Sequence, residues 1–313
     1  MTKHSFPQSF IAPTPDDLKD DFIFGFGQLR GVELRPNGDW RDYVPPEEDQ
    51  RKNFETSACA TYNTIKPIAI LQEETYNLLD QNYSERFISQ LSETTKVGNS
   101  PNKVAQTIRD RGLIPDVVLP FSADLASWEE FNSFKGADKA LCLAMGLEWK
   151  NNWKFGYDWV FNWAEPHTPE QKNALLKEAL KYSPIGVSVA AWYDKDGLYI
   201  KPEGALDNHW VTLVYVDDEG YSYIEDTYPP YLKKLEKNYN FGYAMRYTVE
   251  KIIIEPQKKN WLTILLELIG LLQQPAQKPK PWTMTDNAKT LYYKSKALLG
   301  GDYADHKIAP AGL

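Results

Sequence analysis

The chain has 313 residues, 42% of them hydrophobic and 25% charged, so it can bury a substantial core, and wholly disordered, collagen-like and low-complexity proteins are excluded. With 35 Lys and Arg against 43 Asp and Glu the net charge is −8, and no block of basic residues stands out. That balance argues against nucleic acid or an anionic membrane surface as a partner.

The first half of the chain carries mainly helical patterns. Residues 1–35 are expected to form an extended N-terminal arm laid over a domain, and the first ten residues lack the apolar stretch of a secretory signal. Helices are predicted over 57–79, 102–111, 127–147 and 168–182. Pro67 should kink or break the first of these helices, because proline removes one backbone donor.

The second half of the chain carries mainly strand patterns. Strands are predicted over 186–192, 210–216, 221–225 and 243–254 from their β-branched and aromatic residues, and a hairpin turn over 217–220 joins two of them. The Trp-rich run 149–163 is interpreted as a core helix or a packed insertion, with a ligand platform as the alternative. Helices first and strands afterwards predict an α+β fold with an antiparallel sheet.

The composition changes again after Ile254. A short apolar helix over 261–273, within a segment 255–274, is followed by a Pro/Lys linker over 275–283 and a helical extension over 284–313. An apolar run of this length spans only about 18 Å as a helix, against roughly 30 Å of bilayer hydrocarbon. We therefore predict no membrane span, and expect this helix to pack on its own domain or to mediate self-association. The preceding domain is placed at 36–254, and residues 1–254 should fold and keep their thiol reactivity without the segments after it.

Two cysteines, Cys59 and Cys142, are too few for a disulfide framework. Cys59 stands at the start of the first predicted helix, where the helix dipole and unpaired N–H groups favour the nucleophilic thiolate. A buried structural cysteine is the alternative, although the neighbours of Cys59 are small and polar. Cys142 lies among apolar residues, which indicates packing.

His209 and Asp226 are the second and third candidate site residues. His209 stands at the entrance to a predicted strand, where an imidazole can take a proton from a thiol and pass it to a leaving amine. A strand, a tight turn and a returning strand bring Asp226 beside it, and the carboxylate can then hold the ring N–H. Taken singly, His209 could be a surface or capping histidine and Asp226 a turn residue. The rival histidine, His167, is expected in a loop.

The order Cys59, His209, Asp226 and the segments around these residues resemble the papain-like cysteine peptidases over roughly residues 36–250. The matching segments are Asp39-Trp40-Arg41, Ser57-Ala58-Cys59-Ala60-Thr61-Tyr62, Ser84-Glu85-Arg86-Phe87, the stretch from Gly98 to Ile108, Ser183 to Val189, Asn208-His209 and Asp226-Thr227-Tyr228. The resemblance implies a two-lobe papain-like fold. Its helical lobe comes first, its antiparallel β lobe second, and the cleft lies between them.

The resemblance also implies roles for single residues. Cys59 would be the nucleophile, His209 the proton carrier and Asp226 the group that orients it, with Tyr228 covering the His209–Asp226 bond. Gly98 and Asn99 would bind the main chain of a peptide substrate.

The chain departs from the family pattern around the nucleophile. Asn53 stands where the family has a Gln, six residues before the cysteine, and is expected to bind the oxyanion together with the Cys59 N–H. Gln50 is the alternative side-chain donor to the oxyanion if Asn53 does not serve. Ala60 replaces the bulky Trp that follows the cysteine in the family.

These patterns predict a cysteine peptidase that acts on a peptide or protein substrate. No metal or other cofactor is expected, because no Cys/His cluster has zinc-ligand spacing and no Gly-rich loop follows a strand. A cytoplasmic or virion-associated location is expected. The alternative is a catalytically weak or inactive papain-like module used for binding or assembly within a larger phage or virion-type protein, which the departures at Asn53 and Ala60 keep open.

Overall fold

The computed structural model describes residues 2–3, 9–19, 21–24, 31–45, 48–79, 81–162 and 166–253. The chain divides into two units, Met1–Ile253 and Ile254–Leu313. The predicted helix 261–273, the linker 275–283 and the extension 284–313 lie outside the described residues.

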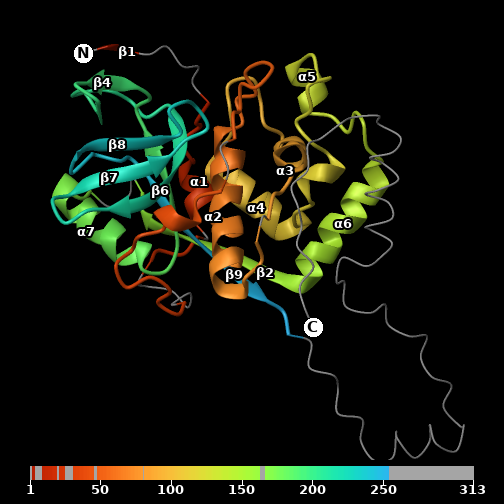
Figure 1. Cartoon of the computed structure of the whole chain (residues 1–313), viewed down its shortest axis with the longest axis horizontal. Helices are drawn as coiled ribbons and strands as arrows, with labels where there is room; N and C mark the ends of the chain where they lie inside the picture. The colour runs from red at the N-terminus through yellow and green to blue at the C-terminus, as the bar shows by residue number, and fades with distance from the viewer. Residues whose placement is uncertain are drawn as a thin grey trace, which may run out of the picture. The chain divides into compact units, whose positions relative to one another are not determined.

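Helices make up one side of the described unit, and Figure 1 shows α2 (Cys59–Tyr76) standing between them and the sheet. The other helical segments are α1 (Pro15–Leu18), η1 (Arg41–Tyr43), α3 (Glu85–Leu91), α4 (Pro101–Arg111), η2 (Asp116–Val118), α5 (Trp128–Phe131), α6 (Lys139–Asn152) and α7 (Pro169–Leu180). Of these, α3, α4 and α6 lie on the far side of α2 from most of the strands, whereas α7 lies on the strand side (Figure 1). None of the helices in the described part of the chain is long and apolar enough to cross a membrane.

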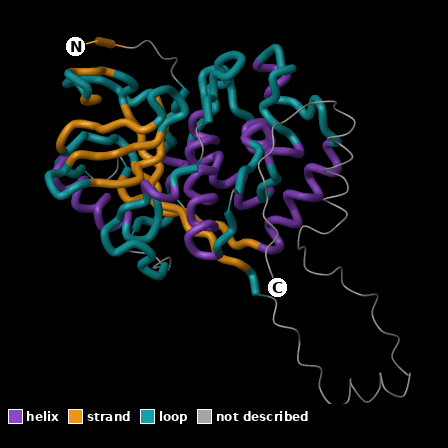
Figure 2. The backbone as a smooth tube through the Cα atoms, viewed as in Figure 1, coloured by secondary structure: helices purple, strands orange, loops and turns teal. Residues whose placement is uncertain are grey.

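The strands form one mixed sheet with the order β1-β4-β5-β8-β7-β6-β3-β9-β2. Their bounds are β1 (Thr2–Lys3), β2 (Trp153–Phe161), β3 (Ile185–Val189), β4 (Tyr193–Lys195), β5 (Leu198–Ile200), β6 (His209–Val216), β7 (Tyr221–Glu225), β8 (Leu232–Lys237) and β9 (Ala244–Lys251). Every described neighbouring pair is antiparallel except β5 and β8. Figure 2 shows the separation of helices and strands, which confirms the predicted α+β fold with two lobes.

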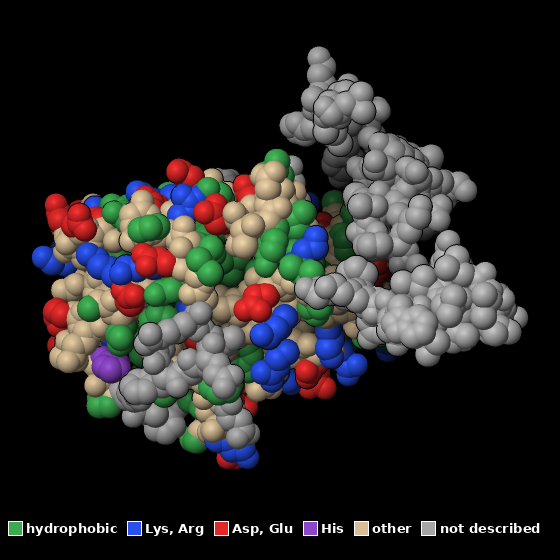
Figure 3. All heavy atoms as spheres, turned by 90° about the horizontal axis from the view of Figure 1, so that it is seen from below, with side chains coloured by type: hydrophobic (Ala, Val, Ile, Leu, Met, Phe, Trp, Pro, Cys, Tyr) green, Lys and Arg blue, Asp and Glu red, His purple; other side chains and the backbone are tan. Residues whose placement is uncertain are grey.

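The buried middle of the molecule joins the two lobes. Helix α2 packs against β6 and β9, and all of its first fourteen residues are buried. This packing sets the start of α2 beside the start of β6, which are the places of Cys59 and His209. On the face shown in Figure 3, acidic and basic side chains are interspersed over the surface.

Of the kink or break predicted at Pro67, the break is wrong, because α2 runs continuously from Cys59 to Tyr76. Proline removes the bond that residue 67 would give to the carbonyl of Asn63. Instead, the Thr212 hydroxyl on β6 lies 3.4 Å from the Asn63 carbonyl oxygen and 3.1 Å from its side-chain oxygen. A tertiary donor thus replaces the missing helical one.

Two other boundaries also differ from the sequence prediction. The helix expected over 127–147 is two helices, α5 and α6, because the chain turns at Gly136 with φ +88° and Asp138 caps the second helix. The Trp-rich run 149–163 is neither one core helix nor an insertion: it spans the end of α6 and strand β2, which pairs with β9 along its length. Aromatic residues at every second position of β2 carry a period-2 signal, which predicts a strand.

Most other predicted elements are confirmed. Helix α4 ends at Gly112, which has φ +71°, and α7 begins with a complete capping box between Thr168 and Gln171. Strands β3, β6, β7 and β9 occupy the predicted strand regions, and the 217–220 turn joins β6 to β7. The short strands β4, β5 and β8 were not predicted.

Candidate active site

Cys59 is the first residue of α2, so its backbone N–H has no acceptor within the helix. The residue before it, Ala58, caps the helix without a side-chain bond, and both residues are fully buried. Ser57 enters the helix with φ +55°, a left-handed conformation that costs of order 1–3 kcal/mol for a residue with a side chain. Two bonds hold this turn: Ser57 N–H donates to Glu55 Oε1 at 2.8 Å, and Ser57 Oγ donates to the Lys96 carbonyl at 2.8 Å.

His209 is the first residue of β6 and is buried beside the start of α2. The Asn63 amide joins the two elements, donating to the carbonyl of Cys59 at 3.1 Å and to that of Trp210 at 2.9 Å. The thiol and the imidazole therefore lie at one junction of helix and strand.

The imidazole of His209 is fixed by Asp226, which directly follows β7. Nε2 of His209 lies 2.6 Å from Oδ1 of Asp226. Burial by itself lowers the pKa of His209, but the carboxylate of Asp226 and the thiolate form of Cys59 outweigh it and raise the pKa to about 10. Nδ1 is buried and has no hydrogen bond of normal length among the described residues, so it is the ring nitrogen left for Cys59.

Asp226 accepts three further hydrogen bonds. Its Oδ2 accepts from the indole N–H of Trp192 at 2.9 Å and from the buried ammonium of Lys233 at 2.7 Å, and its Oδ1 accepts from Thr227 N–H at 2.7 Å. Burial raises the pKa of Asp226, but the positive charges of His209 and Lys233 prevail and hold it well below its usual range. Asp226 is therefore an anion that both cations help to keep ionised.

Aromatic rings enclose the His209–Asp226 pair. Tyr228 is fully buried with its ring centroid 5.1 Å from that of His209, and Trp192 meets His209 edge-on at 6.0 Å. These rings exclude water from the bond between imidazole and carboxylate, which strengthens it. The ring of Tyr228 thus packs against the imidazole of His209.

Asn53, the predicted oxyanion donor, has its amide directed elsewhere. Its Nδ2 donates to the carbonyls of Ser122 at 2.8 Å and Leu125 at 3.2 Å, and the residue is exposed. The structure does not bring this amide to the other site residues.

Gln50, the fallback donor, is fully buried within the site. Its Nε2 donates to Glu55 Oε1 at 2.7 Å and to the hydroxyl of Tyr228, and its Oε1 accepts from the Thr227 hydroxyl at 2.7 Å. The Tyr228 hydroxyl donates in turn to Glu55 Oε2 at 2.8 Å. Gln50 is therefore the side-chain amide that the structure holds beside the histidine and aspartate.

Gly98 and Asn99, the predicted main-chain binding residues, hold a segment of the chain itself. Asn99 N–H donates to the carbonyl of Ser9 at 3.3 Å, and its carbonyl accepts from Ile11 N–H at 3.1 Å. The hydroxyl of Ser9 donates to Cys59 Sγ at 3.1 Å. The N-terminal arm thus passes over the nucleophile and pairs with the residues expected to bind substrate.

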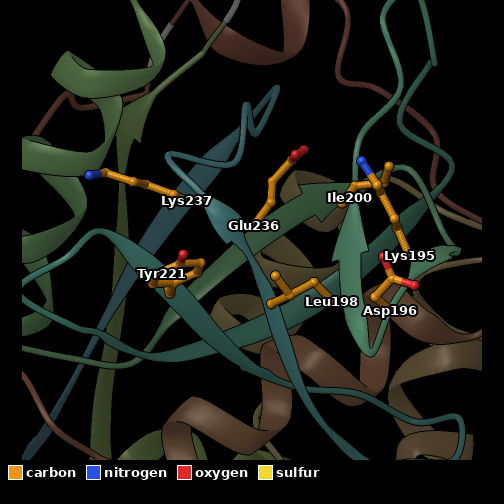
Figure 4. Close-up of a pocket in the computed structure, with 7 residues that line it drawn as sticks. All are labelled: Lys195, Asp196, Leu198, Ile200, Tyr221, Glu236 and Lys237. Atoms are coloured by element: carbon orange, nitrogen blue, oxygen red, sulfur yellow. The ribbon is translucent and has the colours of Figure 1, made fainter.

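The remaining candidates lie away from this site. Cys142 is buried in the apolar core, where burial raises its pKa, and His167 lies in the loop before α7. A hollow of about 360 Å³ lies on the β4, β5, β7 and β8 side of the sheet and includes none of the proposed site residues (Figure 4). Its lining residues are Lys195, Asp196, Leu198, Ile200, Tyr221, Glu236 and Lys237.

Five residues in the site were not singled out from the sequence. They are Ser9, Phe10, Glu55, Trp192 and Lys233. Only Trp192 could have been noticed in the sequence, because it ends the predicted strand that precedes His209. The others depend on contacts between segments that are distant in sequence.

Several solved structures are similar to this chain. Xylellain, a cysteine protease from Xylella fastidiosa, has a TM-score of 0.55 at 14% identity, over 81% of this chain and all of that chain. The digestive procathepsin L2 proteinase from Tenebrio molitor has a TM-score of 0.53 at 16% identity, over 78% of each chain. The chain has a papain-like fold.

Procathepsin B S9 from Trypanosoma congolense shares this papain-like fold, with a TM-score of 0.50 at 12% identity over 79% of this chain and 88% of that one. No family model matches the sequence, and no curated protein matches it. The resemblance first found in short motifs is thus confirmed at the level of a divergent fold.

Proposed function

We propose that the chain is a cysteine peptidase that hydrolyses peptide or amide bonds with Cys59, His209 and Asp226. The observation that carries the proposal is the 2.6 Å bond between His209 Nε2 and Asp226 Oδ1, because it reserves Nδ1 of the same ring for Cys59. The papain-like fold supports the proposal, since the similar structures named above are described as proteases or their precursors.

The reaction follows from these positions. The sulfur of Cys59 attacks the carbonyl carbon of the scissile bond, and its proton resides on Nδ1 of His209. The imidazolium returns that proton to the leaving amine as the C–N bond breaks, which leaves an acyl thioester on Cys59. Water then attacks the thioester, giving one proton to His209, and the acid product leaves as the thiol is restored. Asp226 keeps the ring oriented and balances the charge of the imidazolium.

The oxyanion needs at least one donor besides the free N–H of Cys59. We assign this role to Gln50 in place of Asn53, because the Gln50 amide is held beside Tyr228 and Thr227 while the Asn53 amide bonds to another loop. Gln50→Ala should lower kcat/KM by about 10²-fold, the loss typical of one such donor. Asn53→Ala should change it less than threefold, and the reverse order of effects would return the role to Asn53.

Thiol labelling tests the function directly. An epoxysuccinyl reagent should label the wild-type chain, and Cys59→Ala should abolish the adduct while Cys142→Ala keeps it. Digestion of a peptide library should likewise depend on Cys59. A folded Phe10→Ala chain, in which the arm over Cys59 is weakened, that forms no Cys59 adduct and cleaves no peptide would refute the proposal.

One observation favours the second candidate, a binding or assembly module without strong activity. Both N–H donors of Gln50 are already engaged, by Glu55 and by Tyr228, so an oxyanion would have to compete for them. Under this alternative Cys59 is labelled slowly, no library peptide is cleaved, and Gln50→Ala changes neither result.

A further inference from the structure

Lys233 is a buried lysine that contacts the same carboxylate as the histidine. Its side chain is 1% exposed, and its ammonium donates to Oδ2 of Asp226 at 2.7 Å and to the carbonyls of Tyr228 and Pro230. These bonds use all three N–H donors of a lysine. Asp226 therefore lies between two fixed groups, with Oδ1 at 2.6 Å from His209 Nε2 and Oδ2 at the ammonium.

The hairpin of β7 and β8 brings Lys233 to Asp226, and Figure 1 shows these two strands side by side. Lys233 on β8 lies opposite Ile224 on β7, and the N–H of Asp226 donates to the carbonyl of Tyr231 at 2.7 Å. Side chains alternate between the faces of a strand, so Lys233 is turned into the interior while the next residue, Lys234, is only half-buried. The register of one hairpin thus fixes the ammonium at the site.

Aromatic rings keep water from this ammonium. Nζ of Lys233 lies 5.2 Å from the ring centroid of Trp192 and 5.7 Å from that of Tyr199. Burial lowers the pKa of Lys233, and the carboxylate of Asp226 acts in the opposite direction. Two charges in contact away from water interact strongly, so the cation at Lys233 acts directly on the charge of Asp226.

His209 has two opposite tasks in the proposed reaction. It must hold a proton for the leaving amine, and it must be neutral when water attacks the thioester, because it then accepts a proton from that water. Asp226 and Cys59 raise the pKa of His209 to about 10, which favours the first task. Once Cys59 is acylated it carries no charge. Asp226 and Lys233 then determine how firmly the ring holds its proton.

We propose that Lys233 is a positioning residue of this reaction: by sharing the charge of Asp226, it allows the His209 ring to become neutral and to take a proton from the attacking water. The proposal rests on the peptidase function proposed above. With a protonated ring, the one negative charge of Asp226 faces two cations, and with a neutral ring it faces one. Lys233 therefore favours the neutral ring, while Oδ1 of Asp226 still orients it.

Other titratable and charged groups act on these three side chains from the elements packed around them. They are Cys59 and Lys66 on α2, Arg51 before it, Tyr199 on β5, Glu225 on β7 and Tyr228 after it. Lys66 and Glu225 are paired with each other at 2.6 Å, and burial raises the pKa of both tyrosines, which therefore stay neutral. Cys59 changes its charge during the reaction, and Cys59→Ala reproduces the uncharged state of the thioester.

A titration of the His209 ring by nuclear magnetic resonance tests the proposal without turnover. In the full-length Cys59→Ala chain, adding Lys233→Met should raise the pH at which the ring loses its proton by about one unit, the effect of one nearby charge. Lys233→Gln keeps a donor for Asp226 but no charge, and should raise this midpoint in the same direction. Lys234→Met removes the same charge from the next residue, whose side chain is 39% exposed, and should leave the midpoint unchanged.

Deacylation measures the consequence for the reaction. Full-length Phe10→Ala chains are acetylated at Cys59 with p-nitrophenyl acetate, and mass spectrometry follows the acetyl group on the Cys59 peptide at pH 7. Adding Lys233→Met should slow the loss of the acetyl group about tenfold, because a midpoint one unit higher leaves tenfold less neutral ring. Acetylation itself should change much less, and Lys234→Met should change neither rate.

The two measurements separate this proposal from the function on which it rests. A raised midpoint in a chain that neither loses the acetyl group nor cleaves peptides supports the action of Lys233 on the ring and refutes the peptidase function. A midpoint that stays unchanged in Lys233→Met or in Lys233→Gln overturns the proposal. If Cys59 is still acetylated and regenerated in that chain, the peptidase function stands.

Discussion

Asp226→Asn should both destabilise the protein and weaken the reactivity of Cys59. Asp226 is fully buried and balances two cations, His209 and Lys233. The rise of the His209 pKa from 6.5 to about 10 is equivalent to roughly 5 kcal/mol of interaction with Asp226 and Cys59 together. Removing one partner of a buried ion pair costs about 3–5 kcal/mol, because the other charge stays buried. For a unit of this size the loss lowers Tm by about 10 °C.

Thermal unfolding followed by circular dichroism measures this cost, with Asp218→Asn as the control because Asp218 is exposed on the 217–220 turn. A raised histidine pKa contributes stability that is complete below pH 6.5 and is lost as the pH rises through about 10. Asp226→Asn should therefore also flatten the fall of Tm between pH 6.5 and 10, and should slow alkylation of Cys59 at pH 7 at least tenfold. A Tm within 2 °C of wild type and an unchanged alkylation rate would refute the electrostatic account.

Three further substitutions test the fold around the site. Gly98→Ala should displace the N-terminal arm, because the added Cβ would meet the Ser9 carbonyl, and should make the peptide bonds near Ser9 sensitive to limited proteolysis. Gly136→Ala is the control, since Gly136 also has a positive φ but open space around it, and should leave these peptide bonds protected. Thr212→Val should lower the free energy of unfolding in urea by about 1–3 kcal/mol, because the Asn63 carbonyl beside Pro67 loses its donor. Thr61→Val is the control and should lower it little, because the Thr61 hydroxyl has no hydrogen-bond partner among the described residues. Burial raises the pKa of Glu48 to about 7, so the folded state binds its proton more tightly than the unfolded state, and stability falls as the pH rises from about 4.5 to 7. Glu48→Gln should accordingly raise Tm at pH 8 but not at pH 4.5, and a gain of the same size in exposed Glu219→Gln would contradict this reasoning.

The parts of the site that the sequence predicted are those set by local pattern. His209 and Asp226 meet because two adjacent strands of alternating pattern are joined by a tight turn, and both features can be recognised along a single stretch of chain. Cys59 was placed at a helix start by small residues on one side and a helical pattern on the other. The position of Cys59 beside β6 could not be predicted in this way, because it depends on the packing of α2 against the sheet.

The errors come from interactions between distant segments. Asn53 is bonded to carbonyls 69 and 72 residues further along the chain, which no local spacing reveals. Pro67 is tolerated because Thr212, on another element, replaces the missing donor. In the same way, residues 1–35 carry an extended pattern in the sequence, yet only the contacts of Ser9 and Phe10 show what that segment covers.

The charges buried around the histidine decide how firmly its ring holds a proton. Lys66 pairs with Glu225 at 2.6 Å and Lys233 pairs with Asp226 at 2.7 Å, and all four side chains are at most 2% exposed. Asp226 therefore shares its one negative charge between Lys233 and a protonated His209, in a region that excludes water. An isolated buried cation is costly unless an anion lies nearby. Asp226 is that anion for His209, and Cys59 adds a smaller contribution in the same direction to the raised pKa of the imidazole. The buried Lys233, which the sequence did not single out, thus competes with His209 for the charge of Asp226.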